Sequence, residues 1–278
     1  MSINLKHNRH TLAHLLAHAV LEQYPHAKPT IGPATDTGFY YDFDFSDGEA
    51  PGEDDLKNIQ KTMKKTLGHW TAFTHATVTT EEAREQFADN PYKLELIEEI
   101  AKAGENIALY TVGEGKHTFT DLCRGGHADN PAADIPADSF KLDTIAGAYW
   151  RGDEKNTMLT RIYGLAFGSK DELTTYQTQL EEAKKRDHRK LGKELGLFSF
   201  SELVGPGLPL WSTKGTILRQ EIDRFVQELR KAKGYQAVTI PHLAKKSLYE
   251  TSGHWNKYSD DLFKVRAKDD AENHEEYV

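Results

Sequence analysis

The fold is decided first by a histidine-rich stretch near the N-terminus, Arg9-His10-Thr11-Leu12-Ala13-His14-Leu15-Leu16-Ala17-His18. Its apolar residues recur at the spacing of one helix face, and Asn8 is suited to cap a helix that runs from residue 9 to residue 23, before Pro25. Its histidines are four residues apart, so they drift slowly round one flank of that helix. The stretch therefore predicts a largely apolar helix that carries a row of imidazoles.

The lone cysteine of the chain lies in a glycine-containing loop, Asp121-Leu122-Cys123-Arg124-Gly125-Gly126-His127. A single cysteine allows no disulfide within the chain and no zinc site built from several cysteines. His14 and His18 on the helix, together with Cys123 and His127 in the loop, have side chains that bind metals, transfer protons and attack carbonyl groups. We therefore expect a functional site that brings these four residues together beside Asp121.

Spacing alone leaves three functions open for such a site. The four residues could bind a zinc ion, since two histidines four apart on a helix point the same way. Cys123 and His127 could instead form a nucleophile–base pair for acyl transfer. In a third interpretation the histidines activate a water molecule and Cys123 only lines the pocket. Histidines on a helix flank are also common without any function, and Lys93 by itself is typical of a surface lysine.

Composition excludes several classes of protein. The chain has 278 residues, 38% hydrophobic and 28% charged, which is ordinary for a globular protein of one large or two modest domains. It has no apolar run of transmembrane length and no signal-peptide core, so we expect a cytoplasmic protein without a membrane partner. The net charge of −8 argues against a wide nucleic-acid-binding surface. Any RNA contact should therefore be local, and the best candidate patch is the basic run Lys184–Lys190, although on composition this run is more typical of a solvated helix face.

Periodicity along the chain predicts a mixture of helices and strands. A loop and a half-buried strand occupy residues 31–45, and residues 140–168 contain three strands. A long charged helix from residue 171 to about 195 connects two domains. Beyond it, apolar residues at helical spacing predict a helix over 215–233, and the next segment, 235–240, predicts a strand.

A series of further motifs follows the helical stretch in a fixed order. They are Ile31-Gly32-Pro33, Gly38-Phe39-Tyr40-Tyr41-Asp42, the Cys123 loop, the segments 147–152, 161–164 and 185–192, Gly205-Pro206-Gly207 through Pro241, and Thr251-Ser252-Gly253-His254-Trp255. Together they resemble the editing domain of bacterial threonyl-tRNA synthetases, followed by motif 1 of a class II synthetase. The resemblance spans nearly the whole chain.

The resemblance implies an α+β fold in three parts. Residues 1–170 would form a two-part editing domain of antiparallel sheet with helices, and residues 171–196 a connector helix. Residues 197–278 would form the incomplete N-terminal part of the class II catalytic domain, with the motif 1 helix and strand. The family's N-terminal ubiquitin-like domain, its motifs 2 and 3 and its synthetic-site zinc ligands have no counterpart here. We therefore expect a C-terminally truncated chain that does not charge tRNA. ATP, Mg²⁺ and Zn²⁺ belong to the full-length family enzyme.

The resemblance also implies a proofreading reaction. Threonine and serine differ by one methyl group, whose loss from a pocket costs only about 1–3 kcal/mol, so binding alone admits serine. A second site then hydrolyses the ester of seryl-tRNA(Thr), while the extra methyl of threonine clashes in the editing pocket. The expected partner is the acceptor end of tRNA(Thr) with its seryl group, and motif 1 implies a homodimer.

Residue by residue, the resemblance assigns roles in this hydrolysis. His14 and Lys93 position or activate the water. His18, Cys123 and His127 line the pocket and hold the ribose or the substrate hydroxyl, and Asp121 binds the amine or hydroxyl of the seryl group. Alanyl-tRNA editing domains bind zinc through a similar layout, but the threonyl version is held to work without it, so no editing cofactor is expected. One departure is Gly126, where many relatives carry proline.

Two alternatives remain to be distinguished. One is a free-standing zinc-dependent aminoacyl-tRNA hydrolase whose metal is held by His14, His18, Cys123 and His127. The other is a non-catalytic dimerisation or RNA-binding module. A binding module would not need the set of histidine, cysteine, aspartate and lysine side chains.

Overall fold

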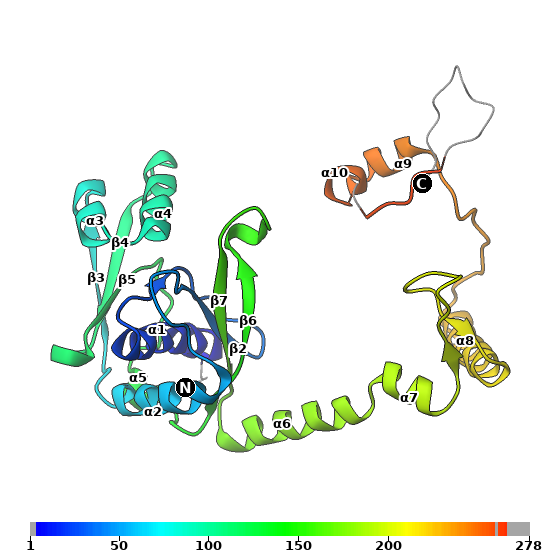
Figure 1. Cartoon of the computed structure of the whole chain (residues 1–278), viewed down its shortest axis with the longest axis horizontal. Coiled ribbons are helices and arrows are strands. Elements are labelled where there is room, and N and C mark those ends of the chain that lie inside the picture. The colour runs from blue at the N-terminus through cyan, green and yellow to red at the C-terminus, as the bar shows by residue number, and fades with distance from the viewer. Residues whose placement is uncertain (1–3, 259–260, 266–278) are drawn as a thin grey trace. The chain divides into compact units, whose positions relative to one another are not determined.

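A computed structural model of the chain describes residues 4–258 and 261–265. It has two compact units, whose boundary lies between Arg186 and Asp187. Helices occur together with antiparallel sheets, which confirms the predicted α+β class (Figure 1). No helix within the described ranges is long and apolar enough to span a membrane.

The first unit is built on a four-stranded antiparallel sheet, in the order β1-β2-β7-β6, and two helices that pack with it. The strands are β1 (Lys28–Pro29), β2 (Gly38–Asp44), β6 (Phe140–Tyr149) and β7 (Met158–Ala166), and the helices are α1 (Leu5–Gln23) and α2 (Leu56–Leu67). β2 and β7 pair along their length, from Gly38 opposite Leu165 to Phe43 opposite Thr160. We call this part the large lobe.

Every second side chain of β2 is a buried aromatic residue that belongs to the main core. Phe39, Tyr41 and Phe43 lie on one face of the strand, at most 1% exposed, and pack in one cluster with the leucines of α1. Burial of such side chains stabilises the fold by roughly 1.5–3 kcal/mol each. On the neighbouring β7, Gly164 lies so close to the Phe39 ring that a Cβ atom would overlap it.

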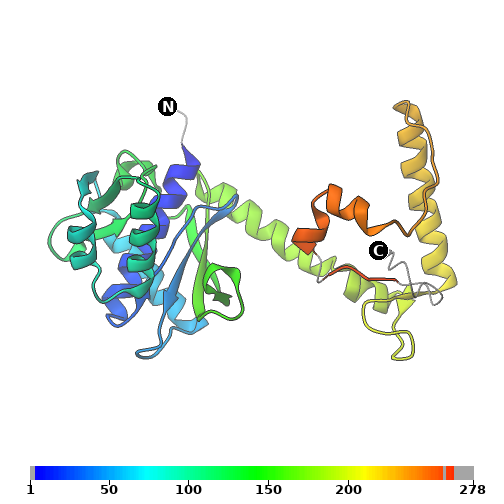
Figure 2. The ribbon, with the colours of Figure 1, turned by 90° about the horizontal axis from the view of Figure 1, so that it is seen from above.

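A second sheet, in the order β3-β4-β5, forms the small lobe of the same unit. Its elements are β3 (Phe73–Val78), α3 (Thr80–Gln86), α4 (Pro91–Lys102), β4 (Ile107–Val112) and β5 (Phe119–Leu122). Figure 2 shows α3 and α4 in blue-green and the β6–β7 hairpin in green. Ala83, Ile97 and Ile107 form a core of their own between α3, α4 and β4. The shorter elements of the unit are η1 (Glu53–Asp55), η2 (Gly115–His117), α5 (Pro131–Asp134) and η3 (Trp150–Gly152).

Two local predictions for the first unit are wrong. α1 begins a turn earlier than expected, because Asn4 rather than Asn8 caps it, accepting a hydrogen bond from the His7 amide at 3.4 Å. The buried Asn8 side chain instead donates to the Asp134 carbonyl at 3.1 Å. Residues 140–168 form two strands rather than three, because β6 passes through an irregularity after Leu142 without ending.

The connector predicted as one helix over 171–196 is also divided. α6 (Lys170–Lys185) ends at Arg186, and α7 (His188–Glu194) starts anew after Asp187. The Asp187 carboxylate accepts a hydrogen bond from the Arg189 amide at 2.8 Å and caps the new helix. A capping carboxylate favours a helix start over continuation, which explains the break.

Within its described residues, the second unit contains α7, a small hairpin and three further helices, namely β8 (Phe198–Ser199), β9 (Leu210–Trp211), α8 (Thr213–Ala232), α9 (Lys246–Thr251) and α10 (His254–Tyr258). Ser212 caps α8, accepting from the Gly215 amide at 3.1 Å. The strand expected over 235–240 is not formed, since a strand needs a pairing partner and none of the described segments pairs with it. The final residues, 266–278, lie outside the described part of the chain.

Candidate functional site

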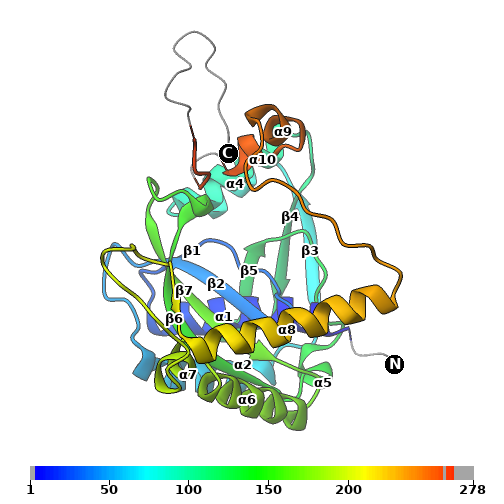
Figure 3. The ribbon, with the colours of Figure 1, turned by 90° about the vertical axis from the view of Figure 1, so that its right-hand side faces the viewer.

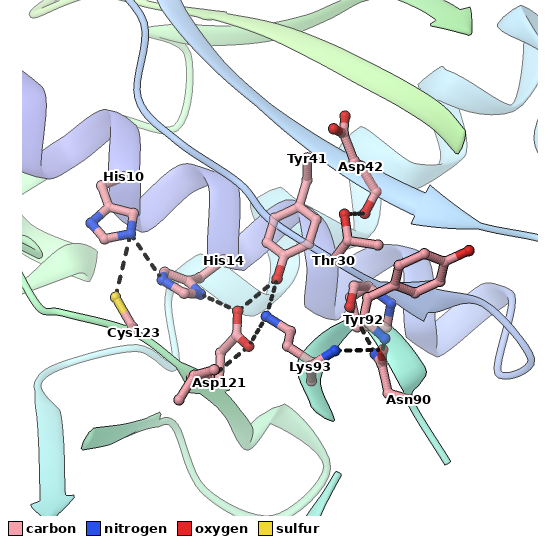
Figure 4. Close-up of polar contacts among 12 residues, drawn as sticks. His10, His14, Thr30, Tyr41, Asp42, Asn90, Tyr92, Lys93, Asp121 and Cys123 are labelled. Carbon is pink, nitrogen blue, oxygen red and sulfur yellow. Dashed lines mark hydrogen bonds and ion pairs between the residues drawn. The ribbon is translucent and has the colours of Figure 1, made fainter. Parts of the chain in front are cut away.

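Side chains from both lobes of the first unit meet at one mostly buried point (Figure 4). They come from α1 (His10, His14), β2 (Tyr41), the first turn of α4 (Lys93), β5 (Asp121) and the loop after β5 (Cys123, His127). Segments more than a hundred residues apart in sequence thus contribute to a single cluster.

Asp121 is the centre of this cluster. One carboxylate oxygen, Oδ1, lies 2.5 Å from Lys93 Nζ. The other, Oδ2, accepts a hydrogen bond from the Tyr41 hydroxyl at 2.6 Å and lies 3.2 Å from His14 Nδ1. All four side chains are at most 3% exposed. The charge of the carboxylate is thus matched inside the protein rather than by solvent, as a buried charge requires.

Local sequence explains why these side chains converge. Asn90 caps α4, accepting from the Lys93 amide at 3.2 Å, and Pro91 occupies the first helical position, so Lys93 lies in the first turn. β5 pairs with β4 so that Asp121 lies opposite Tyr110. Tyr41 points inward because it belongs to the buried face of β2.

A second group of contacts surrounds the Cys123 sulfur. Sγ lies 3.5 Å from His10 Nε2 and 3.4 Å from His127 Nε2. His10 Nε2 also lies 3.2 Å from His14 Nε2, which joins this group to Asp121. The loop can turn here because Gly125 and Gly126 both have a φ of 86°, in the region that favours glycine.

The Asp121 group holds paired charges. Burial alone would raise the pKa of Asp121, but the Lys93 ammonium and the His14 imidazole hold it well below its usual range. Burial alone would lower the pKa of His14, but its contacts with Asp121 and Cys123 raise it to about 9. At neutral pH His14 is therefore an imidazolium, paired with the Asp121 carboxylate at 3.2 Å.

The thiol is strongly acidified. Burial opposes its ionisation, but contacts with His10, His127 and His14 lower the pKa of Cys123 to about 4. Cys123 is thus a thiolate at neutral pH, and its charge and that of the His14 imidazolium stabilise each other. Burial lowers the pKa of His127, so this imidazole is neutral and able to accept a proton.

Comparison with known proteins shows what the chain is related to. No protein-family profile matches it. It is 46% identical over 271 residues to the threonine–tRNA ligase of Synechococcus elongatus, which covers 97% of this chain and 43% of the relative. The corresponding enzyme of Gloeobacter violaceus is 46% identical over 270 residues, and that of Staphylococcus aureus 46% over 265 residues. The chain is homologous to threonine–tRNA ligases.

The homology covers nearly all of this chain but less than half the length of those ligases. It confirms the family resemblance inferred from the ordered motifs. Among the residues that the resemblance singled out, the structure brings together His14, Lys93, Asp121, Cys123 and His127.

His18 does not join them, so its predicted place in the cluster is wrong. Its Nε2 lies 3.2 Å from the Lys116 carbonyl, and its ring packs edge-on to Trp70, 5.9 Å between centroids. Four residues of helix advance about 6 Å along the axis, and the Cys123 loop lies beside the first turns of α1. The histidine that completes the group is therefore His10, one turn before His14 rather than one turn after it.

Two residues of the cluster were missed by sequence reasoning. His10 is in the same four-residue series as His14, so spacing could not say which neighbour of His14 belongs to the site. Tyr41 carried a signal, since it lies on the apolar face of an aromatic strand yet has a hydroxyl group that needs a partner when buried. Its partners are Asp121 and Lys93, whose Nζ lies 3.3 Å from the hydroxyl oxygen.

The four residues around Cys123 also have the chemistry of a zinc site. Ligand atoms of His10, His14, Cys123 and His127 all lie within 4.8 Å of one another. In two of these imidazoles, Nδ1 contacts an oxygen atom. His10 Nδ1 lies 3.2 Å from the Gly126 carbonyl oxygen, and His14 Nδ1 lies 3.2 Å from the Asp121 carboxylate. Such contacts commonly orient metal-binding histidines. The set thus fits zinc by ligand type, with His10 in the place predicted for His18.

Two cavities adjoin the cluster. One of about 640 Å³ borders Cys123 and is lined by α4, Glu105 and Arg124. The other, of about 440 Å³, borders Asp121 and is lined from the large lobe by residues near Pro25 and from the small lobe by residues 85–90. Both are in the size range of small-molecule sites.

Proposed function

We propose that the first unit hydrolyses the ester bond of seryl-tRNA(Thr), and so removes serine that a threonine–tRNA ligase has attached by mistake. The observation that supports this most is the buried His14–Asp121–Lys93 network. It places a proton donor, a charged orienting carboxylate and an ammonium group together in a chain homologous to threonine–tRNA ligases. Ester hydrolysis needs such groups at the reacting carbonyl.

In the proposed reaction a water oxygen attacks the ester carbonyl carbon, and the bond from that carbon to the ribose oxygen breaks. Asp121 fixes the orientation of His14, as the aspartate of a catalytic triad fixes its histidine. Because His14 is protonated at neutral pH, its first step is to donate a proton from Nε2 to the departing ribose oxygen. The neutral His127 is the candidate acceptor for the proton of the water.

Lys93 and Tyr41 complete the site. The Lys93 ammonium provides positive charge where the carbonyl oxygen becomes negative in the transition state. We propose that Asp121 also contacts the amine or hydroxyl of the seryl group. Serine is then distinguished from threonine by the space for one methyl group.

The test is deacylation of seryl-tRNA(Thr) and threonyl-tRNA(Thr) by the purified chain. We expect serine to be released and threonine retained. His14→Ala should slow the release about a hundredfold or more, as loss of a general acid does. His18→Ala is the matched control, since it removes a buried histidine from the same helix outside the cluster, and it should retain activity. Equal release of both amino acids, or equal effects of the two substitutions, would contradict the proposal.

A second candidate is a zinc-dependent aminoacyl-tRNA hydrolase, which is favoured by the convergence of His10, His14, Cys123 and His127. Zinc bound there would polarise the carbonyl group or lower the pKa of a bound water. The two candidates share a substrate and differ in metal dependence.

The partners follow from the homology as proposals. The substrate is the acceptor end of tRNA(Thr), and we propose that the protein works in the cytoplasm.

We also propose a homodimer through the segment 215–241. Ile217, Ile222 and Phe225 on α8 are more than half exposed, which supports this. Sedimentation analysis of the chain and of Ile222→Asp tests it, and a monomeric parent chain would exclude it.

A further inference from the structure

The β6–β7 hairpin extends toward the level of α4 (Figure 3). Two residues at its tip, Trp150 and Arg151, contact that helix. Trp150 is 7% exposed and packs with Tyr92 and Leu159 in a small core separate from the main one. Its ring lies edge-on to the ring of Tyr92, 5.2 Å between centroids. Its Nε1 donates a hydrogen bond to Glu95 Oε2 at 3.0 Å. The hairpin thus joins the large lobe to a helix of the small lobe.

Arg151 adds two ion pairs to the same helix. Its Nε donates to Glu95 Oε1 at 3.0 Å, and a terminal nitrogen donates to Glu99 Oε1 at 2.6 Å. Its backbone has a φ of 60°, and it is the one non-glycine residue with a positive φ in the described ranges. An arginine in this conformation persists when the surrounding contacts hold it there. The two glutamates and Trp150 provide those contacts.

The hairpin tip contacts one face of α4. Tyr92, Glu95, Leu96 and Glu99 are spaced i, i+3, i+4 and i+7, which places them in one stripe along the helix. The Tyr92 hydroxyl at the start of this stripe also donates to Asp44 on β2 at 2.9 Å. Contacts along such a stripe fix both the position of a helix and its rotation about its axis.

The rotation of α4 decides where Lys93 points. Lys93 follows Tyr92 directly, so its side chain leaves the helix about 100° away from the stripe. Its Nζ has to reach Asp121 on β5 while Tyr41 and His14 reach the same carboxylate from the large lobe. The cluster therefore exists only when the two lobes keep their relative position, and the hairpin tip spans them.

We propose that Trp150 and Arg151 are positioning residues for Lys93: the hairpin tip fixes α4 so that the Lys93 ammonium lies at Asp121. This inference rests on the proposed function for its kinetic consequences. Neither residue touches the cluster, so both act through α4.

The test uses substitutions that leave the backbone unstrained. Arg151→Gly removes the guanidinium and suits a positive φ, and Trp150→Phe keeps a ring but loses the bond to Glu95. We expect each to lower kcat for seryl-tRNA deacylation about tenfold with little change in KM, since small misplacements of reacting groups cost up to about a hundredfold. Arg151→Lys should recover part of the loss.

Arg84→Ala is the matched control, since Arg84 pairs with Glu98 on another face of α4, at 2.7 Å, and it should leave kcat unchanged. In a Lys93→Ala background, Arg151→Gly should cause no further loss. A further loss of the same size, or a change confined to KM, would overturn the proposal.

A second readout needs no tRNA. The buried Lys93 ammonium should give a slowly exchanging ¹H–¹⁵N resonance in the parent chain and in Arg84→Ala, and this resonance should be lost or shifted in Arg151→Gly. An unchanged resonance in Arg151→Gly would overturn the proposal even if the chain proved inactive on seryl-tRNA. Inactivity of the parent chain with a lost resonance in Arg151→Gly would refute the proposed function and leave the positioning role standing.

Discussion

Lys93 Nζ and Asp121 Oδ1 lie 2.5 Å apart, and both side chains are almost fully buried. One belongs to the first turn of α4 and the other to β5, so their ion pair forms only when the small lobe is folded. Their charges depend on each other, because removal of one leaves the other uncompensated inside the protein.

This pair gives a prediction about stability and activity. Lys93→Met and Asp121→Asn should each reduce the free energy of unfolding by about 3–5 kcal/mol, as breaking a buried ion pair from one side does. The double variant should recover part of that stability and none of the activity. Urea denaturation and seryl-tRNA deacylation measure the two effects. Additive losses of stability in the double variant would show that the residues are not paired.

The thiol of Cys123 is predicted to react as a thiolate in acidic solution. Because its pKa is lowered to about 4, alkylation by iodoacetamide should stay near its plateau rate down to about pH 5. The lone cysteine makes the reaction specific to this site. His14→Gln should shift the midpoint of the rate profile upward, whereas His18→Gln should not. A midpoint near the ordinary thiol value in the parent chain would contradict the predicted charge state.

The mutual stabilisation of the His14 and Cys123 charges also predicts an unusual dependence of stability on pH. The His14 pKa is raised from 6.5 to about 9 in the folded protein. Its contribution to the unfolding free energy is therefore fully present below pH 6.5 and is lost as pH rises to 9. The Cys123 pKa is lowered from 9.0 to about 4 in the folded protein. Its contribution to the unfolding free energy is therefore fully present above pH 9 and is lost as pH falls to 4. Between pH 6.5 and 9, where both groups contribute a slope, the two slopes cancel.

As far as these two groups determine it, the unfolding free energy of the parent chain should therefore be nearly constant between pH 6.5 and 9. Cys123→Ala keeps the His14–Asp121 contact but removes the opposing slope, so its stability should fall as pH rises over that interval. Denaturation at pH 6.5 and pH 9 measures the difference. Parallel curves for the two proteins would argue against this mutual stabilisation of the two charges.

Metal binding is predicted to depend on His10 rather than His18. If zinc occupies the cluster, His10→Ala and Cys123→Ala should lower the zinc content measured by elemental analysis, and His18→Ala should not. Chelator-treated protein that keeps full deacylation activity would favour the metal-free reaction. Stoichiometric zinc whose removal abolishes activity would favour the zinc-dependent hydrolase.

Packing at Gly164 gives a prediction for the large lobe. Gly164→Ala should lower stability by about 1–3 kcal/mol, because the new Cβ would overlap the buried Phe39 ring. Gly147→Ala on β6 is the matched control, since the nearest atom there is the Met158 sulfur, the end of a flexible and exposed side chain. Thermal unfolding compares the two. Similar melting temperatures would mean that the β2–β7 contact tolerates the extra atom.

Much of the fold followed from local sequence. Helical spacing of apolar residues predicted α1 and α8, and alternation with aromatic residues predicted β2. The residues at which helices start or break were less predictable. Asn4 and Asn8 are equally good caps in isolation, and Asp187 starts a new helix within a run that is helical by composition. The segment 235–240 reads as a strand, but a strand forms only where another segment pairs with it.

The sequence by itself determined which kinds of side chain the site would have. An imidazole series on α1, a lone thiol and a neighbouring aspartate pointed to one cluster, and the ordered motifs to one family. The tertiary structure decided the membership and the charges. The path of β5 past α1 selects His10 and excludes His18, and the rotation of α4 brings Lys93 from an apparent surface position to Asp121. Distances between distant segments, and the burial that shifts a pKa, are set only when the lobes pack together.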